Sequence, residues 1–158
     1  MIAVSVEDEL TINRPQREVF AVLADKQRLP AWTAGVKRSK RLSTGPVGPG
    51  TTYAVVGKML GRRLESTYEV TGYAPHTELS GRLVSSVFTF AETYRLEEED
   101  GATVVRLEAL AEPGTSMRFL WPVLALAVHR QVRADHRRLK TMLERKRTKA
   151  AVPDVKGA

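Results

Sequence analysis

One segment, residues 115–147, limits the possible folds of this chain more than any other. It is apolar from Met117 to Val128 and rich in Lys and Arg from there to Arg147. As a single helix with a rise of about 1.5 Å per residue, it would be about 50 Å long. Its apolar side chains recur every three or four residues, at Met117, Leu120, Trp121, Leu124, Val128, Val132, Leu139, Met142 and Leu143. This single stripe is typical of a helix that packs against a sheet.

The residues before this segment predict the sheet. Residues 2–12 alternate between apolar and polar side chains, as a half-buried strand does. Further strands are expected at 36–43, 51–59, 62–74, 77–84, 86–98 and 102–112. Two of them meet at Leu60-Gly61, and Asp100-Gly101 is a strong hairpin signal. We therefore expect six or seven strands in an antiparallel meander.

Two short helices are expected between the first two strands. Asn13 is a good N-cap, Pro15 falls in the first turn, and Gln16 stands at the capping-box position. A second helix, at about 26–34, carries Trp32 and is opened or interrupted by Pro30. The order of elements predicts an α+β chain in which an antiparallel sheet wraps around the long C-terminal helix.

Length and composition favour one domain. With 158 residues and 42% hydrophobic residues, the chain can bury a sizeable core, and we place a single domain at 1–147 and a disordered tail at 148–158. Cysteine is absent, which excludes disulfides and thiolate metal sites and favours the reducing cytoplasm. A signal peptide begins with a basic region followed by an apolar run, whereas residues 7–9 of this chain are acidic, so we do not expect export. The longest apolar run, 117–128, is too short to span a membrane.

The net charge of +7 is concentrated in the last helix. Between residues 129 and 149, nine basic residues face two acidic ones, a net charge of +7, so the rest of the chain is close to neutral. We expect a solvated helix face, because the apolar stripe continues beneath the charges. Docking on an anionic membrane surface or on RNA is the disfavoured alternative. No aromatic residues interleave with the basic run, so sequence-specific binding of nucleic acid is not expected.

Five short motifs occur in order along the chain. They are Ile12-Asn-Arg-Pro15 with Val19-Phe20, Asp25 with Leu29-Pro-Ala-Trp32, Gly48-Pro-Gly-Thr-Thr-Tyr53, Tyr68-Glu-Val-Thr-Gly-Tyr-Ala-Pro75, and Leu139-Lys-Thr-Met-Leu-Glu144. Over about residues 2–146 the chain resembles the START-like or Bet v 1-like (SRPBCC) superfamily, particularly its bacterial polyketide cyclase/dehydrase branch. The resemblance implies a helix-grip fold with a central cavity for hydrophobic or aromatic small molecules, lipids or polyketides. Because this superfamily includes carriers, receptors and enzymes, the resemblance implies no particular reaction.

Polar residues on inward strand faces are the best candidates for chemistry. Glu92 lies in phase with Phe88, Phe90 and Tyr94, so it should point into the cavity and could act as a general acid or base. A bulge that turns it outward, or a salt bridge with an arginine, are the alternatives. Asp8 carries the same ambiguity, as one of three adjacent acids.

Tyrosines share the inward face with apolar neighbours, and a phenol can both line a pocket and donate a hydrogen bond. The candidate catalytic residues are Glu92, Tyr94, Tyr68 and Asp8. The candidate ligand-binding residues are Trp32, Tyr53, Met59, Tyr68, Phe88, Phe90, Glu92, Tyr94, Met117, Leu120 and Leu124. Ordinary core packing is the alternative for each of them.

The sequence contains no recognisable metal-binding or cofactor-binding motif. His76, His129 and His136 form no pair spaced three or four residues apart, and neither a nucleophile elbow nor a phosphate-binding loop occurs. We expect no metal and no cofactor. The leading hypothesis is a module that binds a hydrophobic small molecule. The alternative is an enzyme of the cyclase, aromatase or dehydratase kind, in which Glu92 or a tyrosine moves a proton.

Overall fold

The computed structural model describes residues 3–156; the side chains of Ser116 and of residues 146–156 lie outside that description. The strands are β1 (Val4–Ile12), β2 (Val36–Arg41), β3 (Thr52–Met59), β4 (Arg62–Ala74), β5 (Glu78–Ser85), β6 (Phe88–Glu99) and β7 (Ala102–Pro113). The helices are α1 (Gln16–Ala24), η1 (Lys26–Arg28), α2 (Leu29–Trp32), η2 (Thr115–Leu120) and α3 (Trp121–Lys156), where η marks a 3-10 helix. The predicted order of one strand, short helices, six strands and a long helix is confirmed.

The sheet is antiparallel throughout, in the order β1-β7-β6-β5-β4-β3-β2. Six of its strands follow one another as a meander, and β1 joins by pairing with β7, so the first and last strands lie side by side. The hairpin signals are confirmed: Leu60 and Gly61 have φ values of 52° and 77°, and Asp100 and Gly101 have 52° and 83°. Positive φ at both central residues matches the twist of the flanking strands.

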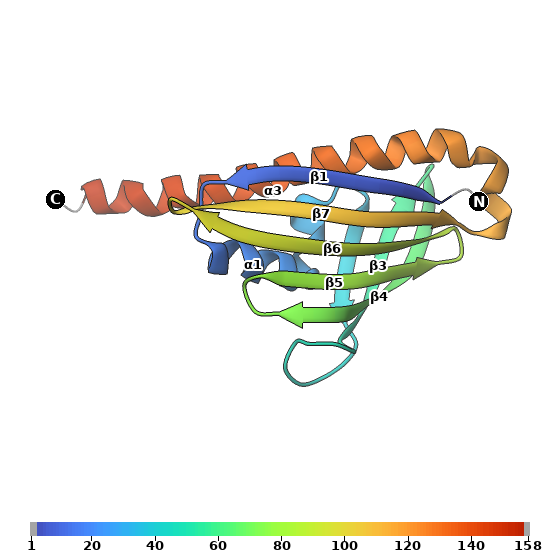
Figure 1. The fold of residues 1–158 in the computed structure, drawn as a ribbon, viewed down its shortest axis with the longest axis horizontal. Helices are drawn as coiled ribbons and strands as arrows, with labels where there is room; N and C mark the ends of the chain where they lie inside the picture. The colour runs from blue at the N-terminus through green and yellow to red at the C-terminus, as the bar shows by residue number, and fades with distance from the viewer. Residues whose placement is uncertain (1–2, 157–158) are drawn as a thin grey trace.

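Helix α3 runs along the sheet, and the short helices α1, η1 and α2 lie on the same side (Figure 1). Short α2 touches both β2 and α3. A helix crossing the inner face of a curved antiparallel sheet is the helix-grip architecture, as predicted. Its geometry leaves the interior of the molecule between α3 and the strands.

The predicted single helix from residue 115 is wrong at its start. Residues 115–120 form the 3-10 helix η2, and α3 begins only at Trp121. The cause is Pro122, which has no N–H to donate to the carbonyl of Arg118, so an α-helix cannot run unbroken through this point. The amide of Trp121 instead makes the tighter 3-10 bond to Arg118 O.

The predicted cap of the first helix is also wrong. Pro15 occupies the N-cap position, without a side-chain cap hydrogen bond. The backbone N–H of Asn13 donates to Glu144 at 2.9 Å, which ties the chain to α3. The side-chain amide of Gln16 donates to the carbonyls of His76 and Leu96 rather than closing a capping box. Both residues are used to join distant parts of the fold.

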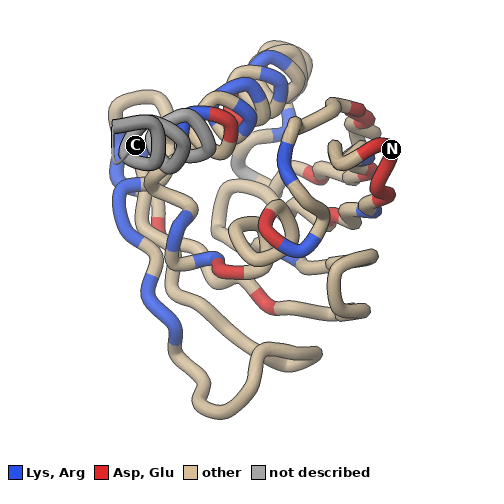
Figure 2. The backbone as a smooth tube through the Cα atoms, turned by 90° about the vertical axis from the view of Figure 1, so that its left-hand side faces the viewer, with Lys and Arg blue, Asp and Glu red and all other residues tan. Residues whose placement is uncertain are grey.

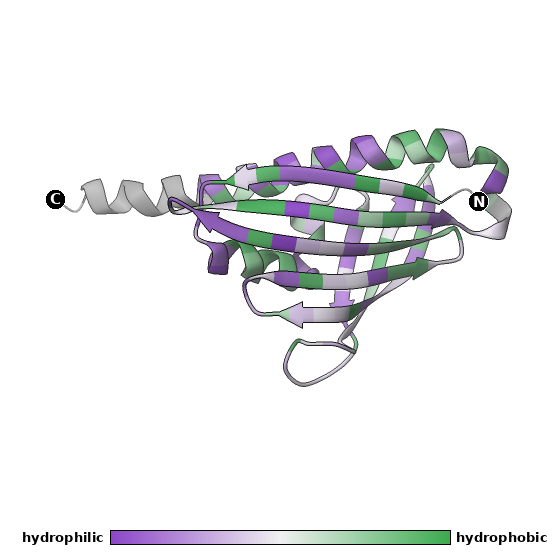
Figure 3. Cartoon of the chain, viewed as in Figure 1, coloured by the Kyte–Doolittle hydropathy of each residue, from purple (hydrophilic) through white to green (hydrophobic). Residues whose placement is uncertain are grey.

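Along α3, the apolar stripe faces the sheet and the cations face outward. Leu139 and Leu143 are buried, whereas Val128, Val132 and Met142 are half-buried against the core. The arginines at 130, 133, 137, 138 and 145 are exposed. Figure 2 shows Lys and Arg recurring along the turns of this helix, and Figure 3 shows its apolar start and its more polar continuation. The predicted disordered tail at 148–158 stays a prediction: α3 extends to Lys156, but the side chains from residue 146 onward and all of residues 157–158 lie outside the described part.

The buried side chains form two clusters inside the sheet. The larger cluster lies along the middle of α3 and includes Val70, Leu79, Leu107 and Leu139. The smaller cluster, which we call the η2-end cluster, consists of buried Phe88, Ala111, Trp121 and Leu124 with half-buried neighbours that include Met59 and Met117. Within the described residues, no helix is long and apolar enough to cross a membrane.

Candidate functional site

A cavity of about 140 Å³ lies inside the larger cluster, between the sheet, the η1–α2 segment and α3. Its apolar walls include Trp32, Phe90, Leu107 and Val132. The volume is smaller than the 300–1,000 Å³ usual for ligand sites and equals about four or five water molecules at about 30 Å³ each. Large side chains and a buried ion pair fill much of the gap between sheet and helix, which leaves a smaller cavity than the aromatic inward face of β6 suggests.

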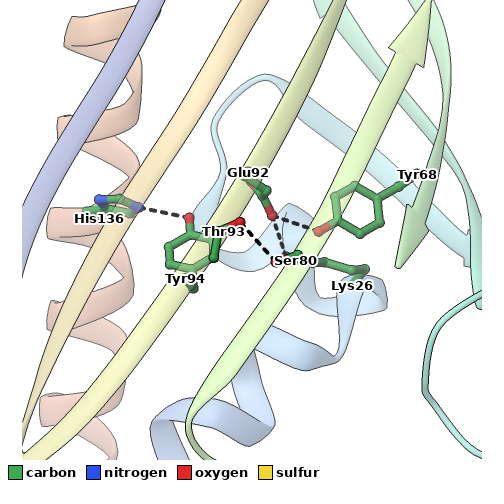
Figure 4. A network of polar contacts seen from close by, with 7 residues as sticks. All are labelled: Lys26, Tyr68, Ser80, Glu92, Thr93, Tyr94 and His136. Atoms are coloured by element: carbon green, nitrogen blue, oxygen red, sulfur yellow. Dashed lines mark hydrogen bonds and ion pairs between the residues drawn. The ribbon is translucent and has the colours of Figure 1, made fainter. Parts of the chain in front are cut away.

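A lysine forms part of the cavity wall. Lys26, in η1, is only 1% exposed, although lysine is among the residue types least often fully buried. Its Nζ donates to Glu92 Oε2 at 3.1 Å and lies 4.8 Å from the ring centre of Tyr68 and 5.5 Å from that of Tyr94. Contacts of this kind between a cation and aromatic faces are stabilising. The ammonium group is thus held between one carboxylate and two rings (Figure 4).

Tyr68 completes this first polar group. Its hydroxyl donates to the same Glu92 Oε2 at 2.8 Å. Burial, and then the charge of Glu92, raises the pKa of Tyr68 well above its ordinary value, so the phenol stays protonated. The ring fits because Gly81 lies beneath it: a Cβ at this position would approach the Tyr68 hydroxyl to 1.9 Å. A glycine on β5 is therefore what lets Tyr68 reach Glu92.

A second polar group connects β1, α3 and β6. His136 Nδ1 lies 2.6 Å from Asp8 Oδ2, and His136 Nε2 lies 2.9 Å from the hydroxyl of Tyr94. With the ring proton on Nδ1, His136 donates to Asp8 and accepts from Tyr94, so all three groups are satisfied. Burial, followed by the charges of Glu92, Asp135 and Asp8, raises the pKa of Tyr94 well above its ordinary value. This hydrogen-bonded series of Asp8, His136 and Tyr94 can pass a proton between a carboxylate and a phenol beside the cavity.

Asp135, also on α3, adds a buried carboxyl group to the cavity wall. It accepts hydrogen bonds from the backbone N–H of Ala34 at 3.2 Å and from the side chain of Gln131 at 2.7 Å. Burial raises the pKa of Asp135, and the two hydrogen bonds oppose that rise. This residue also ties α3 to the segment after α2.

Five of the predicted site residues meet at the cavity: Trp32, Tyr68, Phe90, Glu92 and Tyr94. Glu92 points inward, as strand parity predicts, and its partner is a lysine rather than an arginine. Asp8 also points inward and reaches the cavity through His136. The structure does not bring the other predicted residues to this cavity. Tyr53 packs against Tyr68, Met59, Phe88, Met117 and Leu124 lie in the η2-end cluster, and Leu120 is 40% exposed.

Sequence reasoning missed Lys26, Asp135 and His136. A signal for His136 was available, because it lies four residues after Val132 and three before Leu139 and so falls on the helix stripe. Asp135 packs beside that stripe, where the chain after α2 approaches α3. No pattern marks Lys26, whose burial follows from the 3-10 turn that carries it over the sheet. Among the described residues, no cluster of three or more His, Cys, Asp or Glu is arranged to hold a metal ion.

Comparison with known proteins identifies the family. The family model described as "Polyketide cyclase / dehydrase and lipid transport" matches residues 3–144. The chain belongs to this family. An uncharacterised protein of Mycobacterium tuberculosis and its counterpart in Mycobacterium bovis are each 32% identical over 124 residues, which cover 73% of this chain and 72% of the relative. Membership supports a role in hydrophobic-ligand binding or a role of polyketide cyclase type.

Solved structures agree on the fold. The Zhui aromatase/cyclase from Streptomyces sp. R1128 matches with a TM-score of 0.77 at 17% identity, covering 91% of this chain and 95% of that one. A protein from Thermus thermophilus matches with a TM-score of 0.76 at 15% identity, covering 90% and 99%. Ara h 8.0201 matches with a TM-score of 0.67 at 14% identity, covering 89% and 97%. At such low identities, the structural likeness shows the helix-grip fold and nothing finer.

Proposed function

We propose that the protein binds a small hydrophobic molecule, of about one aromatic ring, in the cavity between the sheet and α3. The observation that carries this proposal is the composition of the wall, in which apolar side chains surround a few converging polar groups. Such a combination is typical of small-molecule sites. The family supports the same role.

The polar groups indicate which kind of molecule fits. Two residues of the cavity wall carry buried polar atoms without a hydrogen-bond partner in the described structure, Trp32 Nε1 and Thr33 Oγ1. Unpaired buried polar groups are costly, and a ligand oxygen or an ordered water within hydrogen-bond reach would satisfy them. The Lys26 ammonium also favours an oxygen acceptor. The ligand is therefore a one-ring or short-chain compound that carries a carbonyl, carboxylate or hydroxyl oxygen.

The size of the cavity limits the ligand further. A space of about 140 Å³ does not admit a multi-ring polyketide or a full lipid chain. Among the ligands expected from the sequence, aromatic small molecules fit best.

Native mass spectrometry of the freshly purified protein, followed by thermal shifts with one-ring aromatic compounds, tests the proposal. We expect a rise in Tm with ring compounds that carry an oxygen, since a ligand that binds only the folded state stabilises it. The variant Val132→Phe fills the cavity and should lose this rise. Val128→Phe, a half-buried position of α3 outside the cavity wall, is the matched control and should keep it. An unchanged Tm across the whole panel at saturating concentration would contradict the proposal.

An enzyme of the cyclase, aromatase or dehydratase kind is the second candidate. The Asp8–His136–Tyr94 chain favours it, because a buried phenol backed by an imidazole and a carboxylate can donate and recover a proton. To test for catalysis, the ring compounds are recovered after incubation with the protein, and their masses are measured by mass spectrometry. A chemical change that is lost in Tyr94→Phe, with binding retained, would place the enzyme first.

A further inference from the structure

The feature that packing does not explain is the amine of Lys26. A buried ion pair contributes little net stability, because the cost of desolvating two charges offsets their attraction. Lys26 nevertheless sits at 1% exposure, and its Nζ makes its ion pair and its cation–ring contacts with residues of the cavity wall: Glu92, Tyr68 and Tyr94. A primary amine in the wall of a cavity that is lined mostly by apolar side chains is a nucleophile as well as a cation.

We propose that Lys26 condenses with a small aldehyde or ketone bound in the cavity and forms an imine with it. This inference rests on the binding function proposed above, and it narrows the ligand class to carbonyl compounds. Carbonyls carry the oxygen acceptor that the polar groups of the wall favour. The cavity, at about 140 Å³, has room for a ring or short chain with one such group, and a bound ring would displace the water that could otherwise hydrolyse the imine.

The reaction needs a neutral amine, and the Glu92 carboxylate can accept the proton that the Lys26 ammonium group must lose. A proton passes from Nζ to Oε2 over the 3.1 Å hydrogen bond, which leaves a neutral amine beside a neutral carboxylic acid. In a low-dielectric interior, removing both charges together avoids the cost of keeping either one buried alone. Tyr68 stays hydrogen-bonded to the same oxygen and holds the carboxyl group in place.

The remaining steps balance without any further reagent. The amine nitrogen attacks the carbonyl carbon, and a proton moves from nitrogen to oxygen to give a carbinolamine. Glu92 then returns its proton to the hydroxyl group, which leaves as water while the nitrogen lone pair forms the C=N bond. The product is an iminium cation beside the Glu92 carboxylate, so the ion pair and the cation–ring contacts with Tyr68 and Tyr94 persist with the charge unchanged.

Reductive trapping tests the inference directly. The wild-type protein is incubated with less than one equivalent of benzaldehyde and with sodium cyanoborohydride, which reduces an iminium ion to a stable secondary amine much faster than it reduces the free aldehyde. Peptide mapping by mass spectrometry then locates the added benzyl group. We expect Lys26 to be labelled at least tenfold more than any exposed lysine, for example Lys58. Labelling spread over the exposed lysines, with Lys26 no higher than they are, would overturn the inference.

Two controls separate this inference from the proposed function. Benzyl alcohol has the same ring but no carbonyl, so it should raise Tm and, in competition, lower the labelling of Lys26 but not of Lys58. If benzyl alcohol binds and Lys26 remains unlabelled, the imine is refuted and the binding function stands. If neither benzaldehyde nor benzyl alcohol binds, both the imine and the proposed binding function are refuted. Lys26→Arg keeps the cation and should abolish the labelled site, whereas Lys58→Arg should leave it intact; circular dichroism confirms that each variant is folded.

Discussion

The two buried clusters inside the sheet differ sharply although the same strands and the same helix supply both. The η2-end cluster is made of Phe88, Ala111, Trp121 and Leu124. In the larger cluster, α3 contributes Val132, Asp135 and His136 to the wall of a cavity that remains open. One end of the interior is filled by apolar packing, and the other contains hydrogen-bonded ionisable groups. The cavity of the proposed function therefore lies at the end of the interior that contains the ionisable groups.

The difference also explains why one aromatic strand face serves two purposes. Phe88 and Phe90 lie two residues apart on β6, yet Phe88 belongs to the η2-end cluster and Phe90 lines the cavity. Glu92 and Tyr94 continue the same face into the polar region. Side chains that share a strand face are therefore not necessarily part of one site, because the elements packed across from them change along the strand.

The largest effect should come from breaking the ion pair of the polar end. Lys26→Met or Glu92→Leu leaves one charge buried without its partner, which typically costs about 3–5 kcal/mol in the free energy of unfolding. The double variant removes both charges and should recover most of that loss. Urea unfolding of the two single variants and the double variant measures the coupling. The exposed pair Arg63 and Glu65 is the control, and Arg63→Met should cost less than about 1 kcal/mol.

Additive losses in the double variant would mean that the two residues do not stabilise each other. The distinction between the two ends would then lose its main electrostatic support.

The same leucine-to-alanine change at the two ends should separate them next. Leu124→Ala in the η2-end cluster creates a new void and should cost about 3–4 kcal/mol, within the range for buried leucines. Leu107→Ala, in the cavity wall, removes a side chain that already faces empty space and should cost about 1 kcal/mol less. Only Leu107→Ala should extend ligand binding to larger ring compounds, as thermal shifts with a graded series would show. Equal broadening in both variants would contradict the division.

The fold could be predicted from the sequence because its signals are local. Alternation with period two marks β1 and β6, and the stripe of residues such as Val132 and Leu139 marks α3. Parity alone also placed Glu92, Tyr68 and Tyr94 on the inner face. What parity could not supply is how far along the interior each side chain lies, which is why Met59, Met117 and Leu124 were expected at the site and lie elsewhere.

The polar contacts could not be predicted, because each joins residues far apart in the chain. Asp8 and His136 are separated by 128 positions, and Lys26 and Glu92 by 66. Such pairs depend on how η1 and α3 pack on the sheet, and the periodic pattern of side chains within one element carries no information about that packing. Lys26 lies in a turn with no apolar pattern, so its burial becomes visible only in three dimensions.

The smallest effect concerns the pH dependence of the polar end, through Asp135. Burial raises the folded-state pKa of Asp135 above its ordinary value of 3.8. A raised folded-state pKa means that this group contributes stability which is fully present below pH 3.8 and is lost as the pH rises through the folded-state pKa. Asp135→Asn keeps an oxygen to accept from Ala34 and Gln131 but cannot ionise. The free energy of unfolding of the variant, relative to wild type, should therefore increase from about pH 3 to about pH 6 in urea titrations. Leu124→Ala, which changes no titratable group, should show a constant difference from wild type over the same range. A difference for Asp135→Asn that is constant, or that shrinks as the pH rises, would mean that burial does not raise the folded-state pKa of the Asp135 carboxyl group.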